Sequence, residues 1–408
     1  MADQIVLINV SGDDYPGLLA MLTSTLAEYQ VQVLDIGQAV IHEELVLGVL
    51  ISLDSGERSQ ILEALSKVAG IARVRLRTTS VSEADYDKWV AQQGKSRYVV
   101  TLVSNGITAQ QIAAVSTIVA QYGLNIADIQ RLSGRVAADH LEQPVRASVQ
   151  LTLRGTLSDE KPLKAALLEA SQRLTFDFSV HRDSVYRRNR RLVAFDMDST
   201  LINAEVIDEL AKIHGVGEEV TAITDAAMQG ELDFDQSFRQ RVKLLSGLSQ
   251  EAFAEVAGAV DLNEGANRLI TALKHFGYRT AIISGGFQYV GEALQKRLGI
   301  DHVFANRVEI VDGVITGKVL GDIVNAQAKA DILKRLCLEE RISLQQAIAI
   351  GDGANDLPML SAAGLGVAYH AKKTVQESVS HNISNFGLDT VLYLIGFSDH
   401  EIEQAIAH

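Results

Sequence analysis

The sequence predicts an α/β protein, with two copies of a βαββαβ unit followed by a doubly wound parallel sheet. After residue 191, short apolar runs alternate with helical stretches, which is the pattern of a parallel sheet covered by helices on both faces. Before residue 185, two series of strand-like and helix-like segments follow the same order. These observations divide the chain into domains at residues 1–82, 95–184 and 185–408.

Each copy in the first half is expected to be a ferredoxin-like unit of strand, helix, two strands, helix and strand. In the first copy, the helix begins with Pro16 and places Leu18, Leu22 and Leu26 on one face. The elements of the first copy lie at residues 5–10, 16–29, 31–39, 45–53, 57–68 and 72–78. Those of the second copy lie at residues 98–103, 109–122, 125–132, 146–153, 161–173 and 176–180.

The segment from Val185 to Arg191, VYRRNRR, contains four arginines and lies at the boundary between the two halves. One interpretation is a patch that binds phosphate or nucleic acid. Because the run is short and lies between domains, we favour a solvated linker.

Composition excludes several classes of protein. The chain carries 37 Lys and Arg against 51 Asp and Glu, a net charge of −14, which argues against non-specific binding to nucleic acid or to an anionic membrane. No apolar run approaches the roughly 20 residues of a membrane span, and the start MADQIVLINV lacks the features of a signal peptide. We therefore expect a cytoplasmic protein. The single Cys337 excludes an internal disulfide and a cysteine-based zinc site.

Carboxylates follow two of the strands expected in the second half. Asp196 and Asp198 come directly after the strand over residues 192–195, and the strand over residues 347–350 leads into Gly351-Asp352-Gly353-Ala354-Asn355-Asp356. An Asp residue often caps a turn or a helix, so each loop by itself is weak evidence. Unpaired carboxylates next to a buried strand are costly, however, which favours a cation or a catalytic role. Ligands of such sheets bind beyond the carboxyl ends of the strands.

The strand over residues 279–284 ends in Ser284-Gly285-Gly286, whose hydroxyl and backbone N–H groups could hold an anion, although a simple tight turn is the alternative. The interval between Asp196 and Ser284 is far longer than one βα crossover needs, which predicts a helical cap at about residues 203–265. Further along, residues 303–310 and 314–319 flank Asp312-Gly313 and predict a β-hairpin.

Taken together, the segments D-x-D-x-T, S-G, Lys329 and G-D-G-x-N-D resemble, in this order, the four motifs of the haloacid dehalogenase-like phosphatases. Over about residues 190–395, FDMDSTLI with Glu205, the stretch from Met228 to Arg241 and GDGANDLPM are similar to the members that act on O-phospho-L-serine. The turn Gly12-Asp13-Asp14-Tyr15-Pro16-Gly17 resembles the start of ACT domains, which are small regulatory modules that bind amino acids. Both βαββαβ units are thus expected to be ACT-like.

The resemblance implies an enzyme that hydrolyses a phosphomonoester through an aspartyl-phosphate. It makes Asp196 the nucleophile, and Asp198 the general acid and base that protonates the leaving oxygen and then activates water. A Mg²⁺ ion is expected on the Asp196 carboxylate, the Asp198 backbone carbonyl and Asp352, because hard oxygen ligands and a phosphate favour this ion.

The resemblance also implies the substrate contacts. Lys329, Ser284 and the Gly285 N–H would hold the phosphoryl oxygens, while Asn355 and Asp356 would orient Lys329 and the metal shell. In the cap, Glu205 would bind an ammonium group, Arg241 a carboxylate, and Met228 and Phe234 would form apolar walls. Without the motifs, the expected role of Glu205 is that of a charge in the first turn of a helix. Arg241 would then form a surface ion pair with Asp235 or Glu231.

O-phospho-L-serine is therefore the expected substrate, and release of L-serine would be the last step of serine synthesis. A different small phosphomonoester, a phosphotransferase reaction or a catalytically silent amino-acid sensor are the alternatives.

The first ACT-like copy is expected to carry any regulatory ligand, around Asp13, Asp14 and Gly17, with L-serine as the natural effector. The second copy has Ser104-Asn105-Gly106-Ile107-Thr108-Ala109 at the matching place, lacks the turn and is expected to serve packing. Paired ACT modules commonly dimerise, which predicts a homodimer.

Overall fold

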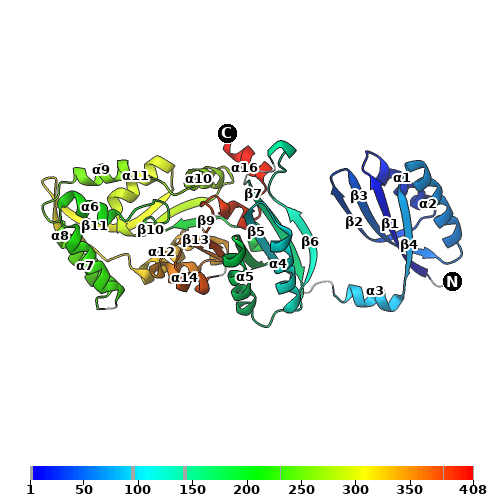
Figure 1. The fold of residues 1–408 in the computed structure, drawn as a ribbon, viewed down its shortest axis with the longest axis horizontal. Coiled ribbons are helices and arrows are strands. Elements are labelled where there is room, and N and C mark those ends of the chain that lie inside the picture. The colour runs from blue at the N-terminus through cyan, green and yellow to red at the C-terminus, as the bar shows by residue number, and fades with distance from the viewer. Residues whose placement is uncertain (1–2, 93–96, 141–144, 230, 380, 408) are drawn as a thin grey trace. The chain divides into compact units, whose positions relative to one another are not determined.

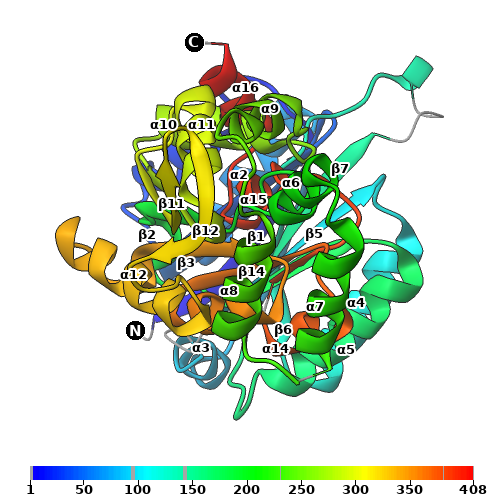
Figure 2. The same cartoon turned by 90° about the vertical axis from the view of Figure 1, so that its left-hand side faces the viewer.

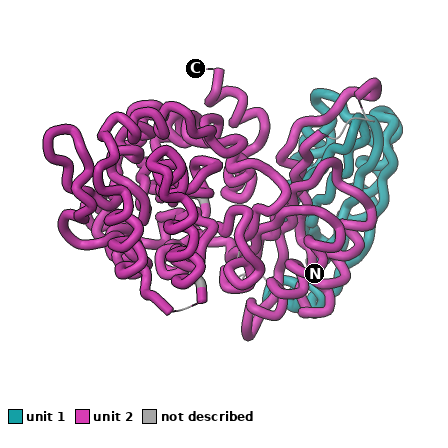
Figure 3. Tube along the Cα trace, turned by 60° about the vertical axis from the view of Figure 1, so that its left-hand side comes forward, with its two compact units in different colours: residues 1–95 teal, residues 96–408 magenta. Residues whose placement is uncertain are grey.

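The computed structural model describes residues 3–92, 97–140, 145–229, 231–379 and 381–407. The chain forms two compact units, residues 1–95 and residues 96–408 (Figure 3). Among the described residues, no helix has both the length and the apolar character needed to cross a membrane.

The first unit is a four-stranded antiparallel sheet in the order β2-β3-β1-β4, with α1 and α2 on one face (Figure 1). Its elements are β1 (Asp3–Asp13), α1 (Leu18–Glu28), β2 (Gln32–Ile41), β3 (Glu44–Asp54), α2 (Arg58–Ala72), β4 (Arg75–Val81) and α3 (Glu83–Val90). Alternate residues of β1 and β3 point to the helices, and they form the core with Leu22 of α1 and Ile61 of α2. The predicted βαββαβ order of this unit is confirmed.

Several details of the first unit differ from the prediction. Helix α1 begins at Leu18, after the N-cap Gly17, and not at Pro16. Helix α2 continues past the expected end at residue 68, because it ends only where Arg73 adopts a left-handed conformation with φ 56°. Helix α3 was not predicted. It begins at the N-cap Ser82, whose hydroxyl accepts a hydrogen bond of 3.1 Å from the Asp85 N–H.

The second unit begins with another copy of the same arrangement. Its strands follow the order β6-β7-β5-β8, which matches β2-β3-β1-β4 of the first unit and confirms the predicted repeat. The elements are β5 (Arg97–Asn105), α4 (Ala109–Gln121), β6 (Asn125–Arg131), β7 (Arg146–Arg154), α5 (Lys161–Leu174) and β8 (Asp177–Arg182).

The remaining strands add to the same sheet, so that the second unit contains one sheet of eleven strands in the order β12-β11-β10-β9-β13-β14-β15-β8-β5-β7-β6 (Figure 1). Strands β11, β10, β9, β13, β14 and β15 are parallel. The sequence predicts β9, β10, β13 and β14 of these, and β12 forms the expected hairpin with β11. It does not predict β15 or the parallel pairing of β11 with β10. Strand β15 pairs antiparallel with β8, His381 opposite Ser179 and Asn382 opposite Phe178. The strands of this part are β9 (Leu192–Phe195), β10 (Arg279–Phe287), β11 (His302–Val311), β12 (Val314–Leu320), β13 (Ala347–Gly351), β14 (Leu365–Tyr369) and β15 (His381–Ile383).

Helices α6 to α9 lie between β9 and α10, where the sequence predicts a helical insertion, and α8 contacts β12 (Figure 2). We refer to α6 to α9 as the cap and to the sheet with its other helices as the core. The helices of this part are α6 (Val206–His214), α7 (Gly217–Met228), α8 (Phe234–Leu244), α9 (Glu251–Ala259), α10 (Ala266–His275), α11 (Gln288–Leu298), α12 (Ala326–Glu339), α13 (Leu357–Ala362), α14 (Lys373–Ser378), α15 (Thr390–Leu394) and α16 (Asp399–Ile406).

The expectation of a solvated linker at residues 185–191 is wrong for two of its arginines, although Val185, Tyr186, Asn189 and Arg191 are exposed. Arg187 and Arg190 of this segment are only 3% and 5% exposed. Arg187 Nε contacts Nε2 of the buried His181 at 3.1 Å, and Arg190 Nη1 donates to the Gln345 carbonyl at 3.3 Å. Burial, together with the neighbouring Arg187, lowers the pKa of Arg190 to about 10. Arg187 and Arg190 are buried because neutral acceptors on β8, at Gln345 and on β13 accept their hydrogen bonds.

Candidate active site

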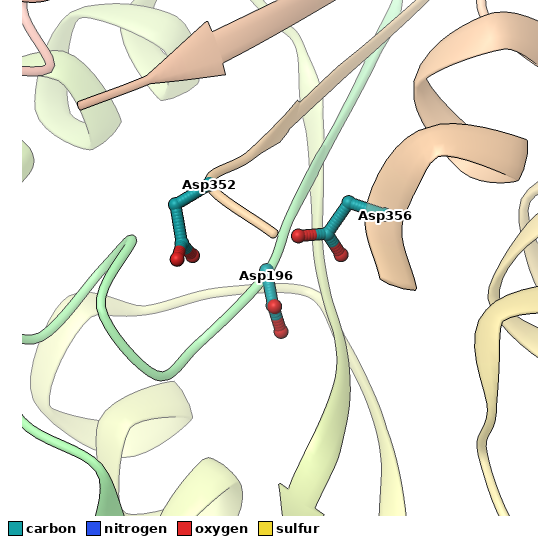
Figure 4. Close-up of side chains that lie close together, drawn as sticks. All are labelled: Asp196, Asp352 and Asp356. Atoms are coloured by element: carbon teal, nitrogen blue, oxygen red, sulfur yellow. The ribbon is translucent and has the colours of Figure 1, made fainter. Parts of the chain in front are cut away.

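The carboxyl ends of β9, β10 and β13 meet at one edge of the sheet, because these strands are parallel neighbours in the order β10-β9-β13. The Asp196 N–H still belongs to this sheet and donates to the Ile350 carbonyl at 2.9 Å. Beyond it, carboxylate oxygens of Asp196, Asp352 and Asp356 lie within 4.8 Å of one another (Figure 4). The two acidic loops that the sequence singles out are therefore adjacent.

Lys329, on α12, lies among these carboxylates. Its Nζ is 2.8 Å from Asp196 Oδ2 and 2.7 Å from Asp356 Oδ1, and the side chain is only 1% exposed. Burial alone would lower the pKa of Lys329, but the two carboxylates outweigh it and raise the pKa above its usual value. The lysine is thus held as a buried cation next to Asp196.

The three carboxylates fit a divalent cation. Burial and the neighbouring Asp196 raise the pKa values of Asp352 and Asp356, which means that the negative charge of this cluster is only partly offset by Lys329. The Thr200 hydroxyl donates to Asp352 Oδ1 at 2.8 Å and orients that carboxylate. A cluster of oxygen ligands with unbalanced negative charge suits a hard ion. Asp356 thus lies close to Asp196 and Asp352, the two carboxylates that the sequence predicts as metal ligands.

Asp198 lies between the core and the cap. Its Oδ1 accepts a hydrogen bond of 3.2 Å from the Val206 N–H at the start of α6. Burial, followed by the nearby Glu205 and Asp196 carboxylates, raises the pKa of Asp198 well above its usual range. A side chain at Gly286 would collide with Asp198 and Met197, so glycine at this position allows the strand to approach so closely. A carboxyl group that keeps its proton can act as a general acid.

Ser284 and Gly285 form a small cradle at the end of β10. Ser284 is 1% exposed, and its Oγ accepts a hydrogen bond of 2.9 Å from the Gly286 N–H. The Gly285 carbonyl in turn accepts a hydrogen bond of 2.8 Å from Asn306 Nδ2. Asn306 was not recognised in the sequence, because a single polar residue within a strand carries no distinctive signal.

A cavity of about 830 Å³ separates the core from the cap. Its lining includes the expected residues Asp196, Asp198, Glu205, Phe234, Arg241, Ser284, Gly285, Asp352 and Asn355. Lys329 and Asp356 are not among the lining residues, but Lys329 contacts Asp196, which is, and also Asp356. The side chain of Met228 is outside the described residues.

Arg241, on the cap helix α8, presents a charged group to this cavity. Its Nε is buried and has no hydrogen-bond partner among the described residues. Burial lowers the pKa of Arg241, against the opposing effect of Asp208 and Glu205. Asp235, which the sequence offers as a surface partner of Arg241, instead accepts a hydrogen bond from Asn325 at 3.1 Å. The guanidinium is therefore available to a ligand.

Glu205 precedes α6 at the rim of the same cavity. Its Oε1 accepts a hydrogen bond of 2.7 Å from the Ser199 hydroxyl. Burial and the carboxylates of Asp352 and Asp196 raise the pKa of Glu205. A nearby ammonium group would relieve this repulsion.

Asn263, immediately after the cap, was also not recognised in the sequence. Its Nδ2 donates to the carbonyls of Ser199, Thr200 and Ile202 at 3.2, 2.8 and 3.3 Å. It therefore fixes the loop that carries Asp198.

The two ACT-like copies differ at the start of their first helix. In the first unit, Asp13 and Asp14 are exposed, and Gly17 caps α1 with a left-handed φ of 99°. In the second unit, α4 begins with a capping box formed by Thr108 and Gln111. Gln111 is buried and donates to Ser104 Oγ at 2.8 Å, so polar side chains of the second copy bond to each other at the start of this helix.

Comparison with known proteins agrees with this arrangement. Residues 193–361 match the sequence profile of haloacid dehalogenase-like hydrolases, and residues 4–78 match that of the ACT domain. The chain is 40% identical over 410 residues to the phosphoserine phosphatase of Streptomyces coelicolor, which covers 98% of this chain and 94% of the relative. The chain belongs to the phosphoserine phosphatase family of haloacid dehalogenase-like hydrolases.

Further relatives support this family. A phosphoserine phosphatase of Mycobacterium tuberculosis is 37% identical over 98% of this chain and 95% of its own length. A solved haloacid dehalogenase family hydrolase of Salmonella enterica serovar Typhi superposes with a TM-score of 0.61 and 34% identity, covering 73% of this chain and 99% of that one. The structure of an unliganded probable phosphoserine phosphatase of Vibrio cholerae superposes with a TM-score of 0.58 and 32% identity. It covers 78% of this chain and 90% of that one. Membership of the phosphoserine phosphatase family confirms the resemblance on which the sequence argument rests.

Proposed function

We propose that this chain hydrolyses O-phospho-L-serine to L-serine and phosphate, the last step of L-serine synthesis, in the cytoplasm. One observation carries the proposal: a single cavity brings together the carboxylates of Asp196 and Asp198 and the Arg241 guanidinium, whose buried Nε has no hydrogen-bond partner among the described residues. The first two suit the cleavage of a phosphate ester, and the third suits the carboxylate of an amino acid.

In the first step, an Asp196 carboxylate oxygen attacks phosphorus and the bond from phosphorus to the serine oxygen breaks. Asp198, whose pKa is raised in the free protein, gives its proton to the departing serine oxygen. In the second step, the now ionised Asp198 takes a proton from water, and the oxygen of this water attacks phosphorus. The acyl phosphate bond breaks, phosphate leaves and the Asp196 carboxylate is restored.

The charge that accumulates on the phosphoryl group has partners on both sides. Lys329 lies 2.8 Å from Asp196 Oδ2 and would stabilise negative charge at that oxygen and on the phosphoryl group. Ser284 and the Gly285 N–H would hold phosphoryl oxygens, and Asn355 also lines the cavity. A Mg²⁺ ion held by Asp196, the Asp198 carbonyl and Asp352, with Asp356 alongside, would reduce the repulsion between nucleophile and phosphate.

The cap would supply specificity. Arg241 can hold the substrate carboxylate with two parallel hydrogen bonds, Glu205 can accept the ammonium group, and Phe234 can cover the short carbon chain. This set of contacts describes a phosphorylated amino acid rather than a sugar phosphate.

A substrate panel tests the proposal. Phosphate release is measured with phosphoserine, phosphothreonine, phosphoethanolamine and sugar phosphates, with Mg²⁺ and with a chelator. Phosphoserine should be preferred, and chelation should abolish turnover until Mg²⁺ is added back. Asp196→Asn should remain folded and inactive. Equal rates across the panel, or activity in this variant, would contradict the proposal and favour another phosphomonoester, a phosphotransferase or a different mechanism.

We propose in addition that the first unit binds L-serine as an effector around Asp13, Asp14 and Gly17, and that the chain is a homodimer. The exposed Asp13 and Asp14 of the first copy, compared with the side-chain capping box of the second, support the ligand site. Calorimetry with L-serine on the whole chain, and on the variant Asp13→Ala, tests the site. Absence of binding at millimolar concentration would exclude it, and light scattering would give the oligomeric state.

A further inference from the structure

The cap and the core are joined by a hydrogen bond that lies outside the proposed substrate contacts. Asn325 Nδ2, on the core, donates to Asp235 Oδ1 in the first turn of the cap helix α8, at 3.1 Å. The opposite side of the same amide caps α12, since Asn325 Oδ1 accepts from the Ala328 N–H at 3.1 Å. The Asn325 carbonyl accepts the Lys329 N–H at 2.9 Å. One side chain thus connects α8 with the first turn of the helix that carries Lys329.

A second polar bridge joins this place to the phosphate cradle. Asn306 Nδ2 donates to the Gly285 carbonyl at 2.8 Å, and Asn306 Oδ1 accepts from the Val324 N–H at 2.8 Å. Val324 immediately precedes Asn325. The cradle and the start of α12 are therefore fixed to each other by a side chain that is only 2% exposed.

The cap helix α8 also contacts the phosphate cradle directly, through Phe234. Phe234, the neighbour of Asp235, lies directly over Gly285, and a Cβ atom at Gly285 would be 2.8 Å from its ring. Arg241 is on the same helix and presents its guanidinium to the cavity. Whatever moves α8 toward the core therefore moves Arg241, Phe234 and Asp235 together.

We propose that Asp235 and Asn325 form the latch of the closed cap, with Asp235 as a positioning residue for the reaction. The proposal rests on the proposed function. The hydrogen bond between Asn325 and Asp235 holds α8 against the core while Arg241 engages the substrate carboxylate, and it joins α8 to the amide that caps the Lys329 helix. The latch retains the substrate while the phosphoryl group is held between the cradle and Lys329.

The chemistry of the pair allows a test that preserves the cap of α12. Asp is as good an N-cap as Asn, so Asn325→Asp keeps an acceptor for the Ala328 N–H. It removes the amide donor, however, and places a second carboxylate opposite Asp235. The double variant Asp235→Asn with Asn325→Asp restores one donor and one acceptor with their sides exchanged. Asp331→Ala is the matched control, because Asp331 is an exposed carboxylate on α12 that bonds Gln327 and Lys334.

We expect Asn325→Asp to raise the KM for phosphoserine about tenfold, with a smaller effect on kcat, since a lost charge-assisted hydrogen bond and a new repulsion disfavour the closed cap. The double variant should return to within about threefold of the original KM. Asp331→Ala should leave both constants unchanged. Hydrogen exchange of the amides of α8 should become faster in Asn325→Asp and return toward the original rate in the double variant.

A wild-type KM and wild-type exchange in Asn325→Asp would overturn the latch, as would a double variant that is no better than the single one. If Asn325→Asp does not fold, Asp235→Ala removes the acceptor without altering α12 and should raise KM by a similar factor. Failure of the wild-type chain to hydrolyse phosphoserine would instead contradict the proposed function, and the exchange measurement would still test the latch.

Discussion

The Thr200 hydroxyl donates a hydrogen bond of 2.8 Å to the Asp352 carboxylate, although the two residues lie in loops that follow different strands. Thr200 is completely buried. A partner that orients a metal-binding carboxylate commonly contributes 10- to 100-fold to metal affinity, so removal of this hydroxyl should weaken the proposed Mg²⁺ site by about tenfold.

Thr200→Val should therefore require about tenfold more Mg²⁺ for half-maximal activity. Thr200→Ser keeps the hydroxyl and should behave nearly as the original chain. The check is a titration of phosphatase activity with Mg²⁺ for the three proteins. Identical titration curves for Thr200→Val and Thr200→Ser would show that the hydrogen bond does not support metal binding.

Replacement of Lys329 by Met should remove the buried cation between Asp196 and Asp356 and abolish measurable turnover. Loss of one partner from a buried ion pair costs about 3–5 kcal/mol, because the remaining carboxylates are left without a counter-charge. The loss of stability should be largest in chelator and smaller in Mg²⁺, since a bound cation can replace part of the missing charge. Urea unfolding under both conditions measures the difference, and equal losses would argue against a cation at these carboxylates.

Replacement of Arg241 by Met should raise the KM for phosphoserine by roughly 10- to 100-fold, which corresponds to one lost charge-assisted interaction. Phosphoethanolamine has no carboxylate, so its hydrolysis should change much less. Steady-state kinetics with both substrates provides the comparison. A similar loss for the two substrates would place Arg241 outside the contacts to the substrate carboxylate.

The buried histidines His181 and His381 should make the second unit sensitive to acid. Burial lowers both pKa values well below 6.5, and the neighbouring positive groups add to this effect. Below about pH 6.5 the unfolded chain takes up protons that the folded chain does not, so stability is complete above that pH and falls below it. Each histidine contributes a slope of up to about 1.4 kcal/mol per pH unit.

Urea denaturation between pH 5 and pH 7.5 measures this slope. His381→Asn should have a shallower slope than the original chain, while the exposed His400→Asn should not differ from it. The comparison isolates the histidine from the carboxylates that titrate in the same range. An unchanged slope in His381→Asn would show that His381 is protonated in the folded state.

The sequence predicts the active-site loops because their position follows from topology alone. Asp196 and Asp352 directly follow strands of a parallel sheet, and Ser284 lies near the carboxyl end of a third. Such ends share one edge whatever the details of packing. Lys329 is different, since it lies on a helix and only the order of the motifs indicates its role. Its 2.7 Å contact with Asp356 depends on how α12 packs against the sheet.

Residues that act through a distant partner could not be predicted. Asn306 and Asn325 connect segments that are far apart in the sequence, and neither has a local pattern that distinguishes it from an ordinary polar residue. The burial of Arg187 and Arg190 was not predicted for a similar reason. A run of arginines is usually solvated unless tertiary structure supplies neutral acceptors. Strand β15 has only three residues, too few for a periodic signal.

The pairing of β15 with β8 has a consequence for solubility. Without β8, the short β15 would be the last strand of a parallel sheet and would offer unpaired N–H and C=O groups to any other strand, which is a common origin of aggregation. The second ACT-like copy covers this edge with a strand of its own and continues the sheet to β6. A chain shortened to begin at residue 191 would keep every residue of the proposed active site but expose that edge. We therefore expect such a fragment to precipitate, whereas a chain that begins at residue 97 should stay in solution.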